Sequence, residues 1–167
     1  MKMCDAWCWF CHTWIFSLGI EALILAYPIT DCDFTRRSYV EPDNQLLMDV
    51  DTMRWFFGHY ASDPATWKRL DVAVLRAPDV ADLPPTLILL AEHDVLRDEG
   101  QAFGDRLRKC AVDTDVQLFR GQMHGFLGLL NLLPAAFDAV DVIVGYVDRV
   151  LLSTTASATT NAPADVR

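Results

Sequence analysis

Two short apolar runs, each bounded by proline, constrain the fold of this 167-residue sequence more than any other feature. Residues 22–27 (ALILAY) end at Pro28, and residues 86–91 (TLILLA) follow a pair of prolines. Continuous apolar runs of this length are typical of strands that are buried on both faces, as in a parallel sheet. Residues 115–120 alternate between polar and apolar side chains instead, which predicts a third strand closer to an edge of the sheet.

Three segments have the periodicity of amphipathic helices: residues 52–61, which follow an Asp51 N-cap, residues 97–111 and residues 134–152. The apolar stripes that we expect to face the core are Met53, Phe56, Phe57 and Tyr60; Phe103, Leu107 and Cys110; and Phe137, Val140, Val144, Val147 and Leu151. Strands and helices that alternate along a chain imply right-handed crossovers. The sequence therefore predicts the α/β class with a parallel sheet.

Irregular segments separate and follow these elements. Residues 30–50 and 62–83 are rich in Asp, Pro and Arg, and two long stretches of this kind indicate function or an excursion that caps the domain. Residues 153–167 (STTASATTNAPADVR) are small, polar and low in complexity, which predicts a disordered tail.

The charge balance excludes one class of partner. The net charge is −9, and no basic run of five or more residues occurs, whereas nucleic-acid binding depends on Lys and Arg that neutralise phosphates. Residues 6–29 are apolar, but His12, Ser17 and Glu21 interrupt them, so they lack the roughly 18 apolar residues of a stable membrane span. A signal sequence is an alternative, although Lys2 is its one basic residue.

Three of the five cysteines crowd into the N-terminal residues. Cys8, Cys11 and His12 match the C-x-x-C-H pattern of covalent haem attachment, in which the histidine is an axial ligand. A zinc site that also includes Cys4 is a second hypothesis. We favour the third, in which residues 1–20 are a poorly organised leader with unpaired thiols.

Polar side chains that could carry chemistry follow the second and third expected strands. Ligands of open α/β sheets bind beyond the carboxyl ends of the strands, and both Asp94 and His124 lie there. A carboxylate that accepts a hydrogen bond from an imidazole fixes its tautomer and leaves the far nitrogen as a general base. The alternative is structural: Asp94 as a helix N-cap or loop carboxylate, and His124 as a loop histidine.

A metal site could combine Glu92 and His93 with Asp94 and His124. However, consecutive residues of an extended segment point in opposite directions, and neither H-x-x-x-H nor H-E-x-x-H spacing occurs. We therefore expect no metal and no cofactor.

Several segments together resemble the α/β-hydrolase fold, and more narrowly the hormone-sensitive-lipase-like esterases. They are residues 27–31 (YPITD), residues 83–86 (LPPT), residues 93–100 (HDVLRDEG) and residues 123–126 (MHGF). The resemblance covers roughly residues 20–150 and implies the C-terminal part of such a fold, with an incomplete sheet.

This resemblance assigns roles and boundaries. It implies that Asp94 is the triad Asp and His124 the triad His, in the chain order of this fold. The hydrolase segment would be residues 21–152, with residues 31–75 as a cap-like excursion. Asp98 and Glu99 also match the family pattern, and we expect them to open a helix, where carboxylates suit the positive end of the dipole.

The family's nucleophile lies in G-x-S-x-G, and none of the five serines lies in that motif. Ser17 comes nearest (IFSLG), but it lacks the first glycine and the room for a helix before residue 22. The H-G-G-G segment of the oxyanion hole does not occur either. The resemblance therefore implies a carboxylic-ester hydrolase segment that is inactive as a lone chain, because triad members act as a unit.

A non-catalytic pseudoenzyme or binding module is the alternative function, so whether the chain is an enzyme stays open. Its partner would be a second copy of the chain that pairs with an exposed sheet edge, whereas the parent family acts on small acyl esters. Cys32 and Cys110 have the pattern of reduced thiols, which favours a cytoplasmic location.

Overall fold

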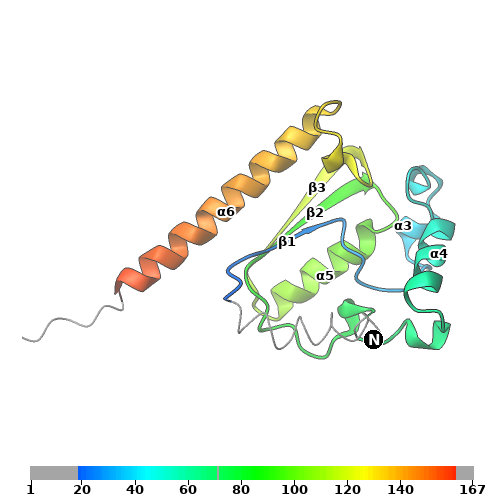
Figure 1. Ribbon diagram of the computed structural model, residues 1–167, viewed down its shortest axis with the longest axis horizontal. Helices are drawn as coiled ribbons and strands as arrows, with labels where there is room; N and C mark the ends of the chain where they lie inside the picture. The colour runs from blue at the N-terminus through cyan, green and yellow to red at the C-terminus, as the bar shows by residue number, and fades with distance from the viewer. Residues whose placement is uncertain (1–18, 71, 161–167) are drawn as a thin grey trace, which may run out of the picture.

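A computed structural model describes residues 19–70 and 72–160 and contains a parallel sheet of three strands in the order β1-β2-β3. The strands are β1 (Leu23–Ala26), β2 (Thr86–His93) and β3 (Thr114–Met123), and they lie side by side in Figure 1. β2 pairs with both neighbours in parallel, with Leu23 and Thr114 both opposite Thr86. The three predicted strands and the edge position of the third are thus confirmed for the described residues. The prediction that residues 22–27 are buried on both faces is wrong, because β1 is also an edge strand among the described strands and alternates between half-buried and exposed residues.

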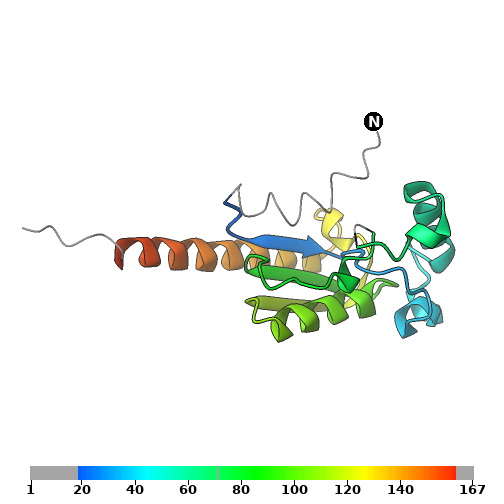
Figure 2. The same ribbon diagram turned by 90° about the horizontal axis from the view of Figure 1, so that it is seen from below.

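Two helices, α5 (Arg97–Lys109) and α6 (Pro134–Thr160), cover opposite faces of the sheet. Alternate residues of β2 face opposite ways: Ile88 and Leu90 pack with Phe103 and Leu107 of α5, while Leu87 and Leu89 pack against α6. Figure 2 shows α5 nearer the viewer and α6 behind the strands. All six residues 86–91 of β2 are buried, as the continuous apolar run requires.

Short helices between β1 and β2 form a separate layer near the carboxyl ends of the strands (Figure 1). They are α3 (Arg37–Val40), η3 (Pro42–Asn44), α4 (Val50–Tyr60) and η4 (Pro64–Thr66), whereas η5 (Val74–Arg76) packs beside α5. Tyr39, Met53 and Phe57 from this layer are buried with Val95 and Leu96, the residues that follow β2. The apolar cluster fixes the layer to the end of the strand that carries Asp94.

α4 differs from the sequence prediction in two respects. Its N-cap is Asp49 rather than Asp51, because the Asp49 carboxylate accepts a hydrogen bond of 2.7 Å from the Thr52 amide. Met53 and Phe57 are buried, but Phe56 and Tyr60 are exposed. The helix therefore buries a narrower stripe than predicted, since it lies on the layer's surface and contacts the rest of the molecule along one side.

The predicted core stripe of α6 is wrong. Phe137, Val144 and Leu151 are exposed, and the residues that face the sheet are Ala136, Ala139, Tyr146 and Val150. The sequence offers two apolar stripes on this helix, and the sequence prediction places the larger side chains inside. The alanines allow the helix to approach the end of β2 closely, where they pack with Ala91 and Phe126.

The chain ends also bear on the sequence predictions. α6 continues to Thr160, so residues 153–160 are helical rather than part of the predicted disordered tail; no proline interrupts the helix before residue 163. Residues 161–167 lie outside the described residues, as do most of the expected leader, its four haem or zinc ligands and Ser17. In the part of the chain that the structure describes, no helix has the length and apolar content to cross a bilayer.

Candidate active site

Asp94 and His124 meet at the carboxyl edge of the sheet. Asp94 directly follows β2 and His124 directly follows β3, so parallel pairing brings them together. The His124 Nδ1–H donates to Asp94 Oδ2 at 2.9 Å. The Asp94 side chain is 1% exposed and that of His124 is 19% exposed. A buried carboxylate thus holds one nitrogen of an imidazole that solvent still reaches.

The Asp94 carboxylate is fixed on its other side by the backbone. Its Oδ1 accepts a hydrogen bond of 2.9 Å from the Leu96 amide, which closes the turn between β2 and α5. Both carboxylate oxygens are therefore engaged, and the imidazole has a stationary acceptor. This arrangement stabilises the tautomer that carries its proton on Nδ1 and an imidazolium that forms at Nε2.

The loop after His124 depends on a glycine. Gly125 has φ +79°, in the left-handed region that side chains rarely adopt. The chain then enters η6 (Phe126–Gly128), whose first residue Phe126 is fully buried. The H-G-F sequence therefore turns the chain sharply after the histidine and anchors the turn in the core.

Three consecutive residues of α5 bind the layer that contains α3. Arg97 contacts Glu41 at 2.9 Å, and Asp98 Oδ2 accepts from the Ser38 amide at 2.8 Å. The Ser38 hydroxyl in turn donates to the Val95 carbonyl at 2.6 Å. The Arg97–Glu99 segment, which we call the clamp, therefore joins the layer to the turn that holds Asp94.

Glu99 completes the clamp from a fully buried position. Its Oε1 accepts hydrogen bonds from the amides of Thr30 at 2.7 Å and Asp31 at 3.3 Å, and its Oε2 accepts from the Tyr39 hydroxyl at 3.1 Å. Burial raises the pKa of Glu99 to about 7, although these hydrogen bonds oppose the shift.

The prediction that Asp98 and Glu99 open a helix is confirmed, since both lie in the first turn of α5. Their contacts with Ser38, Thr30 and Asp31 do not follow from the sequence. These contacts span about 60 to 69 positions of sequence, and the sequence offers no signal for the pairing beyond two carboxylates next to each other.

Glu92 lies apart from the Asp94–His124 pair. Its Oε2 accepts from the Gly121 amide at 2.7 Å, and Arg120 lies 3.8 Å from its Oε1. Among the described residues, no group of three or more His, Cys, Asp or Glu side chains is arranged to hold a metal ion. The four-residue metal hypothesis therefore finds no support in the geometry.

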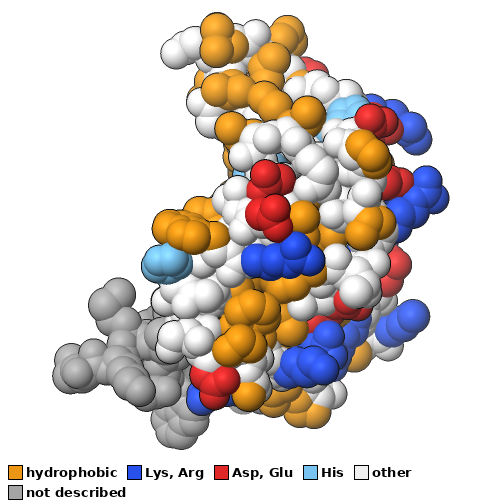
Figure 3. Space-filling view, turned by 90° about the vertical axis from the view of Figure 1, so that its right-hand side faces the viewer, with side chains coloured by type: hydrophobic (Ala, Val, Ile, Leu, Met, Phe, Trp, Pro, Cys, Tyr) orange, Lys and Arg blue, Asp and Glu red, His pale blue; other side chains and the backbone are white. Residues whose placement is uncertain are grey.

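An exposed apolar side chain lies beside the loop that carries His124. Leu47, which is 64% exposed, lies beside Gly125, where an added Cβ would come within 3.5 Å of its Cδ2. Trp55 and Phe56 of α4 are also exposed and contact each other edge to face. Figure 3 shows this end of the molecule, where hydrophobic side chains are scattered over the surface.

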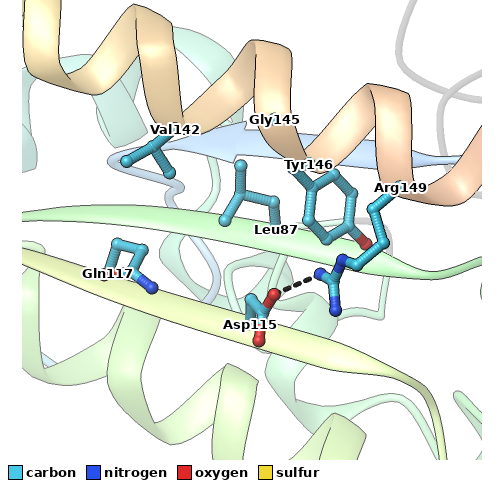
Figure 4. A pocket seen from close by; sticks show the side chains of 7 residues that line it. All are labelled: Leu87, Asp115, Gln117, Val142, Gly145, Tyr146 and Arg149. Carbon is cyan, nitrogen blue, oxygen red and sulfur yellow. Dashed lines mark hydrogen bonds and ion pairs between the residues drawn. The ribbon is translucent and has the colours of Figure 1, made fainter.

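A concavity lies at the other end of the strands, between α6 and the sheet (Figure 4). Its volume is about 150 Å³, and Leu87, Gln117 and Tyr146 are among its lining residues. Arg149 pairs with Asp115 across it and lies over the Tyr146 ring. Because it lies at the amino ends of β2 and β3, it is remote from Asp94 and His124.

Comparisons with known proteins agree with the fold. A family model described as the alpha/beta hydrolase fold matches residues 10–128. A putative alpha/beta hydrolase of Acanthamoeba polyphaga mimivirus is 32% identical over 132 residues, which are 76% of this chain and 38% of the relative. An ethyl acetate hydrolase of Pseudomonas putida is 28% identical over 72% of this chain and 38% of its own length.

A solved structure gives the same result. The esterase of Pyrobaculum calidifontis superposes with a TM-score of 0.74 and 26% identity, and the match covers 84% of this chain and 47% of the esterase. The chain therefore spans less than half the length of each of these three proteins.

Proposed function

Because the chain belongs to the α/β-hydrolase fold family, among its hormone-sensitive-lipase-like esterases, we propose that it carries the acid–base half of a carboxylic-ester hydrolase. The 2.9 Å hydrogen bond between His124 Nδ1 and the buried Asp94 carboxylate supports this most directly. In this proposal Asp94 orients the imidazole, and His124 Nε2 removes a proton from a nucleophile.

The nucleophile and the oxyanion donors would come from outside this sequence. The sequence contains neither G-x-S-x-G nor H-G-G-G, and Ser38 has its hydroxyl bonded to the Val95 carbonyl. Loss of a single oxyanion donor lowers kcat by roughly 10²–10³-fold, and loss of the serine removes the acyl-enzyme route. We therefore propose that the lone chain turns over esters poorly or not at all.

A direct assay tests the inactivity. The purified 167-residue chain should hydrolyse short-chain p-nitrophenyl esters no faster than its His124→Ala variant does. His59→Ala is the matched control, because His59 is an exposed histidine on α4. Substantial turnover that disappears in His124→Ala but persists in His59→Ala would contradict the proposed inactivity.

A chimera tests the positive role of the pair. Residues 20–167 would be joined to the part of the Pyrobaculum calidifontis esterase that precedes its matched region. We expect ester hydrolysis that Asp94→Asn lowers by on the order of 10⁴-fold, because the asparagine favours the wrong tautomer. An active chimera that tolerates both Asp94→Asn and His124→Ala would rule out the proposed roles.

The substrate class is a second part of the proposal. The exposed Leu47 side chain beside Gly125 suits a small acyl ester, and one relative is named for ethyl acetate. Comparison of acetate, butyrate and decanoate esters with the active chimera tests this; a preference for the longest ester would contradict it.

The outer edge of β1 supports a non-catalytic alternative, in which another strand pairs with it. The amides of Leu23 and Tyr27 donate to the β2 side, so in a parallel strand the amides of Ile24 and Ala26 point to the other edge. Among the described strands, none pairs with that edge. A second copy of the chain could pair there and form a homodimer.

The oligomeric state tests this alternative. Light scattering should give a dimer for the wild type and a monomer for Ile24→Pro, which removes one outward amide and leaves the bonds to β2. Leu25→Pro is the contrasting variant, because it loses an amide that faces β2. A monomeric wild type would exclude strand addition.

A further inference from the structure

Tyr27 joins the end of β1 to the loop that carries His124. It directly follows β1 and has φ +47°, a conformation that is unusual for a bulky side chain. Strained backbone of this kind persists where the surroundings over-determine it and is common at functional sites. The contacts of the Tyr27 side chain indicate what holds it there.

Three contacts of Tyr27 reach three residues of the His124 loop. Its ring lies 5.0 Å from the His124 imidazole, centroid to centroid and tilted by 52°. Its ring also meets Phe126 edge to face at 5.5 Å. Its hydroxyl accepts a hydrogen bond of 2.7 Å from the Leu127 amide, one of the first amides of η6, which lack partners within the helix.

The imidazole needs a second constraint besides Asp94. The bond from Nδ1 to Asp94 fixes one ring atom, and the ring plane can still tilt about it. An aromatic ring packed against the imidazole restricts that tilt, and a hydrogen bond to the loop three residues later fixes the backbone from which the imidazole extends.

We infer that Tyr27 is a positioning residue for His124, which holds the imidazole plane with its ring and the histidine loop with its hydroxyl. The inference rests on the proposed function, because it concerns the same imidazole. Burial raises the pKa of Tyr27, and the nearby Asp94 adds to the shift. The hydroxyl is therefore uncharged at neutral pH, and its hydrogen bond with the Leu127 amide does not depend on pH there.

The test uses the 167-residue chain with ¹⁵N-labelled histidine. Two-bond ¹H–¹⁵N spectra report which ring nitrogen carries the proton, and amide hydrogen exchange reports the Leu127 bond. The wild type should show His124 with its proton on Nδ1. In Tyr27→Phe the Leu127 amide should exchange about tenfold faster, since one hydrogen bond is lost, with the His124 ring signals still close to those of the wild type.

A second variant separates the ring from the hydroxyl. In Tyr27→Leu the Nδ1 and Nε2 shifts of His124 should converge, because the imidazole then samples other orientations and tautomers. Tyr146→Phe is the matched control: the Tyr146 hydroxyl is buried without a hydrogen-bond partner, and its removal should leave both readouts unchanged. Circular dichroism confirms that each variant is folded.

The outcomes are distinct from those of the proposed function. Unchanged His124 signals in Tyr27→Leu, or unchanged Leu127 exchange in Tyr27→Phe, would overturn the inference even if the chimera hydrolyses esters. An inactive chimera would instead count against the proposed function and leave these spectra as they are.

Discussion

Glu99 is a fully buried carboxylate that receives hydrogen bonds from one distant segment, through Thr30, Asp31 and Tyr39. Desolvation disfavours its charged form and raises its pKa from 4.5 to about 7. Between these two pH values the folded chain binds a proton that the unfolded chain has released. Protonation is therefore linked to folding, and the stability of the chain falls as the pH rises through this range.

Substitution of Glu99 by glutamine should remove this dependence. In the wild type, the contribution of this site to the free energy of unfolding should be full at and below about pH 4.5 and should fall by up to about 3 kcal/mol by pH 7. In Glu99→Gln the side chain stays neutral throughout. Urea unfolding at several pH values measures the difference, with Asp105→Asn, an exposed position on the same helix, as the control. Parallel pH profiles for the wild type and Glu99→Gln would contradict the assignment.

Gly125 is a second single residue whose identity affects the stability of the fold. Its φ of +79° strains any side chain, so Gly125→Ala should lower the free energy of unfolding by about 1–3 kcal/mol. Gly128→Ala is the matched control in the same turn, because an added Cβ there meets nothing within 4 Å. Thermal unfolding compares the two. Equal stabilities would show that the loop relaxes around the alanine.

At the scale of elements, α6 presents different faces to the sheet and to solvent. Val150 is 5% exposed and packs with Leu87 and Leu89, whereas Val144, six residues earlier on a different face of the helix, is 51% exposed. Burial of each methylene-sized group contributes roughly 0.8 kcal/mol. The two valines therefore contribute differently to the free energy of unfolding, although their side chains are identical.

A pair of substitutions measures this difference. Val150→Ala should lower the free energy of unfolding by about 2 kcal/mol, because two buried methyl groups are lost and a small cavity remains. Val144→Ala should change it by less than about 0.5 kcal/mol. Urea unfolding is the measurement; a larger loss for Val144→Ala would mean that the predicted stripe, not the observed one, packs in solution.

The helices and strands also show which structural features could be predicted from the sequence. Two strands could be predicted from continuous apolar runs and the third from its alternation of polar and apolar side chains. The meeting of Asp94 and His124 could be predicted because parallel strands end at one edge. The buried face of α6 could not, since two apolar stripes compete and local periodicity cannot weigh them. The contacts of Glu99 could not either, because they depend on which distant loop the fold brings to the helix.

At the scale of the whole molecule, net charge and exposed apolar surface act against each other. The chain carries a net charge of −9 at pH 7, while Leu47, Trp55, Phe137 and Leu151 are exposed. Net charge keeps such surfaces apart. Close to the pI of about 4.7 this repulsion vanishes, although protonation of Glu99 favours the fold there.

We expect the solubility of the chain to pass through a minimum near pH 4.7, with self-association rather than unfolding as its cause. Light scattering and circular dichroism between pH 4 and 8 distinguish the two. Particle size should rise toward pH 4.7 while the helical signal persists. Loss of the helical signal at the same pH would contradict this account.

The clamp has a consequence for how the molecule opens. Arg97, Asp98 and Glu99 contact residues 30–41 from a helix whose preceding turn holds Asp94, so a fluctuation that releases one part exposes the other. Amides in such linked segments exchange with solvent as a cooperative unit, with one shared opening free energy. Residues 30–41 and 94–100 would then form a single foldon. A substitution that destabilises either segment would also lower the opening free energy of the other.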